Sequence, residues 1–109
     1  MRIIDYFTAG GKNLITEYLK SLPKDEMKEG YEIRHRIKQQ GILALNDLDT
    51  RQLRGKLYEI KFRKNRIMYI LKDIESIFFL HACKKQKGKA EHFELNKAIH
   101  RAEEKGVVL

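Results

Sequence analysis

Two neighbouring segments with a two-residue period constrain this chain more than any other feature. From Leu57 to Arg63, apolar and charged residues alternate, which is typical of a strand with one buried face. A second such run follows Lys64-Asn65, and a two-residue turn there would place Lys61 opposite Met68. The pattern therefore predicts a β-hairpin.

The two faces of this hairpin differ in character. The apolar set, which we expect in the core, comprises Tyr58, Ile60, Phe62, Ile67, Tyr69 and Leu71. The opposite face gathers Lys61, Arg63 and Arg66 around Met68. The hairpin is thus predicted to have a dry side and a basic, solvent-facing side.

Further elements surround the hairpin. The run from Ser76 to Cys83 is apolar in both phases, which predicts the central strand of the sheet, and it ends in an exposed basic loop, Lys84 to Lys89. Residues 1–8 suit a short strand. Two helices are expected next, and together they form a helical hairpin: residues 14–22, which Asn13 would cap, and residues 25–40, which Gly41 would end. Residues 90–105 suit a last helix. We expect an α+β fold: an N-terminal helical hairpin packed on a small twisted antiparallel sheet, with a C-terminal helix. Because 109 residues enclose one core, residues 1–109 should form one domain.

The net charge of +8 is concentrated in one segment. From Arg51 to Lys89 there are 12 basic and 3 acidic residues, whereas the rest of the chain carries 11 and 12. A field of one sign attracts polyanions, so nucleic acid is the leading class of partner and an anionic membrane surface the second. The competing interpretation is that these lysines and arginines only keep the protein soluble.

The sequence argues against a membrane span, a secretory signal and a metal site. No apolar run approaches the about 20 residues of a membrane helix, and no signal peptide is evident, so we expect a cytoplasmic protein. The four histidines, at 35, 81, 92 and 100, fit no metal-binding spacing, and His81 suits a satisfied core histidine. Cys83 is the single cysteine, and we expect it to have only a packing role. We predict no cofactor.

Cleavage of RNA needs a base for the 2′-hydroxyl, cations for the phosphorane and an acid for the leaving oxygen. Lys61 lies close to Arg63 and Arg66 in the predicted hairpin, and crowding by like charges makes a lysine a better base. Arg66 would stay charged and hold a phosphate with two parallel hydrogen bonds.

A set of short motifs, in order along residues 53–102, resembles the phage-derived HigB-like branch of the RelE/ParE toxins. The motifs are Leu53-x-Gly55-x-Leu57-Tyr58-Glu59-Ile60-Lys61, Arg66-Ile67-Met68-Tyr69, Leu80-His81 and Lys84-Lys85. The resemblance implies a RelE-like fold and metal-free cleavage of messenger RNA at the ribosome. It also implies a cognate antitoxin, often of the helix-turn-helix type, and contact with operator DNA only through that antitoxin.

Carried over by position, the resemblance assigns site residues. Lys61, Arg66 and Lys84 are the expected catalytic residues, with Lys61 or Lys84 as base, and Glu59 is expected to orient a neighbouring cation. Further expected RNA contacts are Lys56, Arg63, Lys64, Lys85, Lys87 and Lys89.

The leading hypothesis is therefore the toxin of a type II toxin-antitoxin system, a ribosome-dependent endoribonuclease. The alternative, on the same fold, is a non-catalytic module: a ParE-like inhibitor of a DNA-handling enzyme or a co-repressor subunit. A general RNA chaperone is a third interpretation, disfavoured because no stacking aromatic is evident on the basic face.

Overall fold

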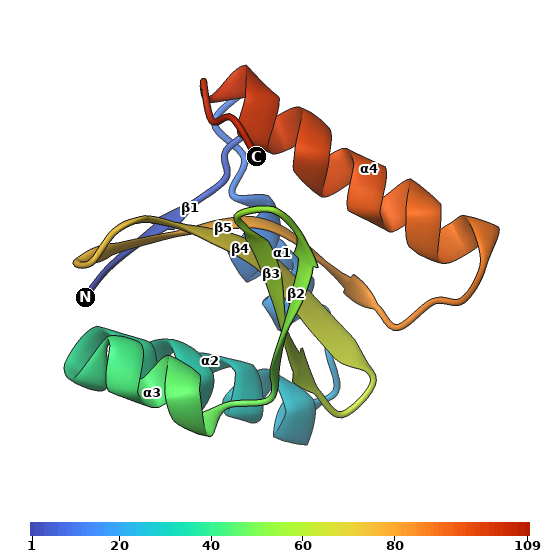
Figure 1. Cartoon of the computed structure of the whole chain (residues 1–109). Coiled ribbons are helices and arrows are strands. Elements are labelled where there is room, and N and C mark those ends of the chain that lie inside the picture. The colour runs from blue at the N-terminus through green and yellow to red at the C-terminus, as the bar shows by residue number, and fades with distance from the viewer.

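The computed structural model describes residues 1–109 and places one sheet between two layers of helices (Figure 1). The strands are β1 (Arg2–Asp5), β2 (Thr50–Arg54), β3 (Leu57–Phe62), β4 (Asn65–Asp73) and β5 (Ser76–Lys84). The helices are α1 (Leu14–Lys20), α2 (Lys24–Gln40), α3 (Ile42–Asp47) and α4 (Lys89–Glu104). The α+β class is thus confirmed, and none of these helices has the length and apolar character needed to cross a membrane.

The sheet is mixed, so the expected antiparallel sheet is only partly correct. Its strand order is β1-β5-β4-β3-β2, and β1 pairs with β5 in parallel, whereas the other pairs are antiparallel. The strand expected over residues 1–8 is present as β1 and precedes the helical hairpin of α1 and α2, so the hairpin is not strictly N-terminal, and a third helix follows it. β5 has a strand on each side as expected, but β4 is the central strand.

The β3–β4 hairpin turns one residue earlier than the sequence suggested. Its turn is Arg63-Lys64, and Lys61 pairs with Arg66 instead of Met68. Arg63 has a φ of 53°, a left-handed conformation that suits the first position of a tight hairpin turn. The change in register is two residues, an even number, so every side chain keeps its predicted face.

Both faces of the sheet are covered, which corrects the expected open basic side. The face bearing Ile60 and Phe62 packs on α1, α2 and α3. The face bearing Leu57 and Met68 packs on α4 through Ala98 and similar small or apolar residues. The predicted apolar stripe of α4 requires this cover, because it would otherwise be exposed to water. Of the basic residues of this face beside the β3–β4 turn, Lys61 is half-buried and Arg66 is buried.

Capping residues explain where several elements begin and end. The Asn13 side chain accepts hydrogen bonds from the backbone amides of Ile15 and Thr16, which starts α1 as predicted. Gly41, with a φ of 59°, ends α2 and leads into α3. These turns fix the helical layer against the first face of the sheet.

Candidate functional site

A cavity of about 150 Å³, which we call the charged cavity, opens beside the β3–β4 turn. Its wall contains no apolar residue and consists of Asp49, Lys61, Arg63, Asn65, Arg66 and Lys85. Four of these six residues are cations that the sequence had indicated, and they come from β3, the turn, β4 and the end of β5. The fold therefore gathers Lys61, Arg63, Arg66 and Lys85 around one solvent-accessible space.

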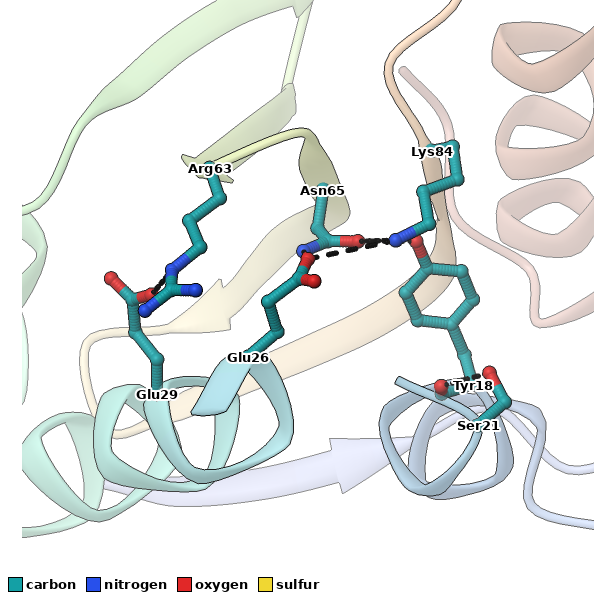
Figure 2. A network of polar contacts seen from close by, with 7 residues as sticks. All are labelled: Tyr18, Ser21, Glu26, Glu29, Arg63, Asn65 and Lys84. Carbon is teal, nitrogen blue, oxygen red and sulfur yellow. Dashed lines mark hydrogen bonds and ion pairs between the residues drawn. The ribbon is translucent and has the colours of Figure 1, made fainter. Parts of the chain in front are cut away.

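The charged cavity continues into a wider groove of about 420 Å³ toward α2 and α3. Asp49, Lys61 and Arg63 line both spaces, and the backbone amide of Lys61 donates to the Asp49 carbonyl at 2.8 Å. Arg63 also donates to Glu29 of α2 at 2.8 Å, in an exposed pair that constrains it only weakly (Figure 2). The wall near Lys61 is thus held by main-chain contacts, while Arg63 stays adjustable.

Arg66 is buried at the base of the charged cavity and is already paired. Its Nε lies 3.4 Å from Glu59 of β3, and its Nη1 donates to Glu91 of α4 at 3.0 Å. Arg51 of β2 approaches the same two carboxylates, at 3.0 Å from Glu59 and 3.3 Å from Glu91. The hydrogen bond from Arg66 and the positive charges around Glu91 lower the pKa of that carboxyl group. These four side chains, two arginines and two glutamates, join the sheet to α4.

Glu59 is the most constrained member of this network. Its side chain is fully buried, yet neither carboxylate oxygen completes a well-directed hydrogen bond, and the Nε of Arg66 lacks one too. The carboxylate is therefore held mainly by the charges of Arg51 and Arg66. The sequence-based expectation that Glu59 orients a neighbouring cation agrees with this arrangement, and that cation is Arg66.

Lys84 lies on the opposite face of the sheet from Lys61 and Arg66. It pairs in register with Asn65, whereas its neighbour Cys83 pairs with Arg66, and successive residues of a strand point to opposite faces. Figure 2 shows its Nζ donating to the Asn65 side chain, at 2.9 Å, beside Tyr18 of α1. The expected grouping of Lys84 with Lys61 and Arg66 is therefore wrong, and Lys85 takes its place.

Asn65 links Lys84 to the helices. Its side-chain oxygen accepts from Tyr18 at 2.6 Å and from Lys84, and its amide donates to Glu26 at 2.8 Å (Figure 2). The hydrogen bond from Asn65 is the largest cause of a lowered pKa at Glu26. This network anchors the hairpin end on α1 and α2, a structural task that the sequence did not indicate.

The remaining expected RNA contacts fall into two groups. Lys64 lies next to Lys85, whose backbone amide donates to the Lys64 carbonyl at 2.7 Å, and the loop that carries Lys87 is exposed. Lys89 opens α4 and is exposed as well. Lys56 sits in the β2–β3 turn, at the other end of β3 from the charged cavity. We therefore exclude Lys56 from the site.

His81, Cys83 and Glu94 form the one group of donor atoms close enough to suggest a metal site, within 4.8 Å of one another. Arg101 donates to the His81 Nδ1 at 2.9 Å, and because arginine only donates, Nδ1 accepts and Nε2 carries the hydrogen. Nε2 then donates to Glu94 at 2.5 Å, so its lone pair is not available to a cation. Burial lowers the pKa of His81, which favours this neutral form. The group is a hydrogen-bonded part of the core, as expected for His81, and both nitrogens of that histidine are engaged by protein partners.

Asp49 and Glu91 are the residues near the cavity that sequence reasoning missed. Asp49 precedes a strand too short to be recognised, and Glu91 belongs to a helix whose rotation over the sheet is set by tertiary packing. Neither residue stands in a pattern that would single it out.

Comparison with protein families gives one match. Residues 17–103 match the family model described as phage derived protein Gp49-like (DUF891), and this range includes every residue of the charged cavity. No curated protein matches the chain. Since the match covers most of the 109 residues, the chain belongs to the Gp49-like family of phage-derived proteins.

Proposed function

We propose that this protein is a toxin of a type II toxin-antitoxin system that cleaves messenger RNA on the ribosome, with the charged cavity as its active site. The observation that carries the proposal is the cavity itself, where four cations and one acidic residue surround a space without apolar lining. Such a wall suits a phosphodiester, whose charge increases in the transition state of cleavage. The phage-derived family and the motif order that resembles RelE/HigB toxins support the same assignment.

In the proposed reaction the 2′-oxygen of the message attacks the adjacent phosphorus and the bond to the 5′-oxygen breaks. Arg66 and Lys85 bind the non-bridging oxygens, which become more negative as the phosphorane forms. The products are a 2′,3′-cyclic phosphate and a 5′-hydroxyl. These residues supply the positive charge, so the reaction requires no metal.

Two residues of the cavity wall transfer the protons. Asp49, the one acidic residue of the wall, accepts the proton of the 2′-hydroxyl. Lys61 donates a proton to the leaving 5′-oxygen. This assignment replaces the expectation that Lys61 or Lys84 is the base, because Lys84 lies on the other face and the cavity offers a carboxylate instead.

Arg66 must exchange a partner when RNA binds. Its Nη1 is held by Glu91, whose side chain is 38% exposed and can turn toward water, whereas Glu59 is fully buried and cannot. An incoming phosphate therefore takes the place of Glu91, and Glu59 keeps the guanidinium in position. Glu59 is a positioning residue in this scheme.

The test is to map the 5′ ends of messages in a purified translation reaction, with and without ribosomes. Wild type should give cuts that need ribosomes, and Lys61→Ala and Lys85→Ala should each lower the rate by about 10²-fold or more. Lys56→Ala is the matched control, because it removes an exposed lysine from the far end of β3. Equal loss in all three variants would indicate a general effect of charge and would contradict the proposed site.

One observation favours the non-catalytic alternative, an inhibitor of a DNA-handling enzyme or a co-repressor. Arg66 is paired with two carboxylates, as a purely structural arginine would be. If that alternative is correct, no cuts appear at any dose, and toxicity or repression persists in Lys61→Ala.

A toxin of this kind needs a neutralising partner, and we propose a cognate antitoxin of the helix-turn-helix type. It would connect the toxin to operator DNA, and covering the charged cavity with acidic residues would be sufficient for inhibition. Co-purification with the product of a neighbouring gene, lost when that gene is deleted, tests this pairing.

A further inference from the structure

We propose that the outer face of α4 is a second RNA-binding surface, on which Phe93 stacks against an unpaired base. The outer face is defined here by the exposed residues between the end of β5 and the second half of α4: Lys85, Gln86, Lys87, Gly88, Lys89, Ala90, His92, Phe93, Asn96, Lys97 and His100. The inference shares with the proposed function only that the partner is RNA, and it does not require cleavage.

Phe93 is unusual among the apolar residues of α4 because 61% of it is exposed. The ammonium group of Lys97, one turn further along the helix, lies 4.8 Å from the centre of its ring. An aromatic ring beside a cation offers a base both stacking and a nearby charge for its phosphate. This platform is not evident from the sequence, because only the rotation of α4 decides whether Phe93 faces the sheet or water.

The charges of the outer face all have one sign. Its exposed residues include four lysines and no carboxylate. Of the two acidic residues in this part of α4, Glu91 contacts Arg66 of the sheet. Glu94 contacts His81 of the sheet, and its second carboxylate oxygen lies 3.8 Å from the ammonium group of Lys97. Lys89, Phe93 and Lys97 follow one another at four-residue intervals, so they form a stripe about 12 Å long on one side of the helix.

This stripe suits RNA better than a protein helix. A docked amphipathic helix needs several apolar side chains at helical spacing, and the outer face offers one large apolar side chain among cations. The basic loop from Lys84 to Lys89 leads from the charged cavity to the stripe (Figure 1). One RNA can therefore occupy the cavity and extend along α4.

The experiment uses the absence of tryptophan from the chain. Phe93→Trp introduces a single tryptophan into the full-length protein, which can be excited apart from the five tyrosines, and stacking on a base should quench its emission. The probe is single-stranded 2′-O-methyl oligoadenylate, which has no free 2′-hydroxyl and cannot be cut by the proposed mechanism. Phe7→Trp is the matched control, since Phe7 is 49% exposed but lies outside the outer face.

Binding measurements on other variants separate stacking from charge. Phe93→Leu should weaken binding of the oligonucleotide about tenfold with the same dependence on salt, and Phe93→Tyr should restore it. Lys97→Ala should lower the slope of log affinity against log salt by about 0.7. A wild-type affinity in Phe93→Leu would overturn the proposal.

The fluorescence of Phe93→Trp shows whether RNA or a protein partner occupies the outer face of α4. Quenching of Phe93→Trp, but not of Phe7→Trp, by the oligonucleotide supports the surface even if no message is ever cut. Unchanged emission at saturating oligonucleotide would overturn it, as would quenching by the antitoxin alone. Loss of cleavage in Lys61→Ala with quenching intact would leave both proposals standing at their separate sites.

Discussion

Replacing Arg66 by alanine should lower the free energy of unfolding, because Arg66 belongs to a buried charge network. The substitution therefore tests that network as well as catalysis. The substitution removes the closest buried cation from Glu59, whose side chain is fully buried and makes no well-directed hydrogen bond. Arg51 remains at 3.0 Å but is 46% exposed, so it compensates only in part. Leaving a buried charge without its partner costs about 3 to 5 kcal/mol. Small proteins have total stabilities of about 5 to 15 kcal/mol, so this loss is large.

Urea unfolding followed by circular dichroism measures that cost. With a slope of about 1.5 kcal/mol per molar urea, the midpoint of Arg66→Ala should fall by about 2 to 3 M. Arg66→Met combined with Glu59→Leu removes both charges while nearly keeping their volumes, and it should recover most of the loss. The two single substitutions should therefore be strongly non-additive.

Two results would refute this reasoning. One is an Arg66→Ala protein within about 0.5 kcal/mol of wild type, the range of an ordinary surface substitution. The other is additivity of the substitutions at Arg66 and Glu59. Either would mean that Glu59 is stabilised without Arg66, and that Arg66→Ala is a clean probe of catalysis. Until then, Lys61→Ala and Lys85→Ala are the better probes, because neither residue is fully buried.

Three further predictions follow from other contacts. Glu91→Gln removes the exchangeable partner of Arg66, so RNA should bind up to about fivefold more tightly by filter binding, and unchanged or weaker binding would count against the proposed exchange. Burial lowers the pKa of His81 below its ordinary 6.5, so the unfolded chain binds more protons than the folded chain just below that pH. Stability should therefore fall as the pH drops through 6.5. Thermal melts should show this fall in wild type, and a His81→Gln protein with the same fall would argue against the assignment. Gly55→Ala should lower the melting temperature, since Gly55 has a φ of 54° and a new Cβ would lie 2.9 Å from the Leu109 backbone; an unchanged melt would mean that the C-terminal residues are not packed there.

Much of the fold could be predicted because the spacing of apolar and polar residues determines the type of each element and its buried face. The faces of the β3–β4 hairpin were correct even though its turn was misplaced, because a shift of two residues preserves alternation. α1, with its Asn13 cap, and the apolar side of α4 followed from helical spacing in the same way. The parallel pairing of β1 with β5 joins segments that are far apart in the sequence, such as Arg2 and Ser76, and leaves no local signal.

The site was harder to predict because it depends on how α4 packs on the sheet. It also depends on which of two adjacent residues faces the charged cavity. Lys84 and Lys85 are adjacent and chemically identical, yet only Lys85 lines the charged cavity; Lys84 pairs with Asn65 as the last residue of β5, whereas Lys85 follows the strand. Glu91 and Phe93 are two residues apart on α4, and one binds Arg66 while the other faces solvent. Neither role could be deduced before the rotation of α4 was known.

The most direct test of the charged cavity uses two messages that differ by one atom. In one, the nucleotide before the mapped cut carries its 2′-hydroxyl; in the other, that position is 2′-deoxy, and both are translated with wild type, Lys61→Ala or Lys56→Ala protein. We predict that wild type and Lys56→Ala cut only the hydroxyl message, leaving a 2′,3′-cyclic phosphate, and that Lys61→Ala cuts neither. Cutting of the deoxy message, undiminished cutting by Lys61→Ala, or no cutting by wild type would contradict the account.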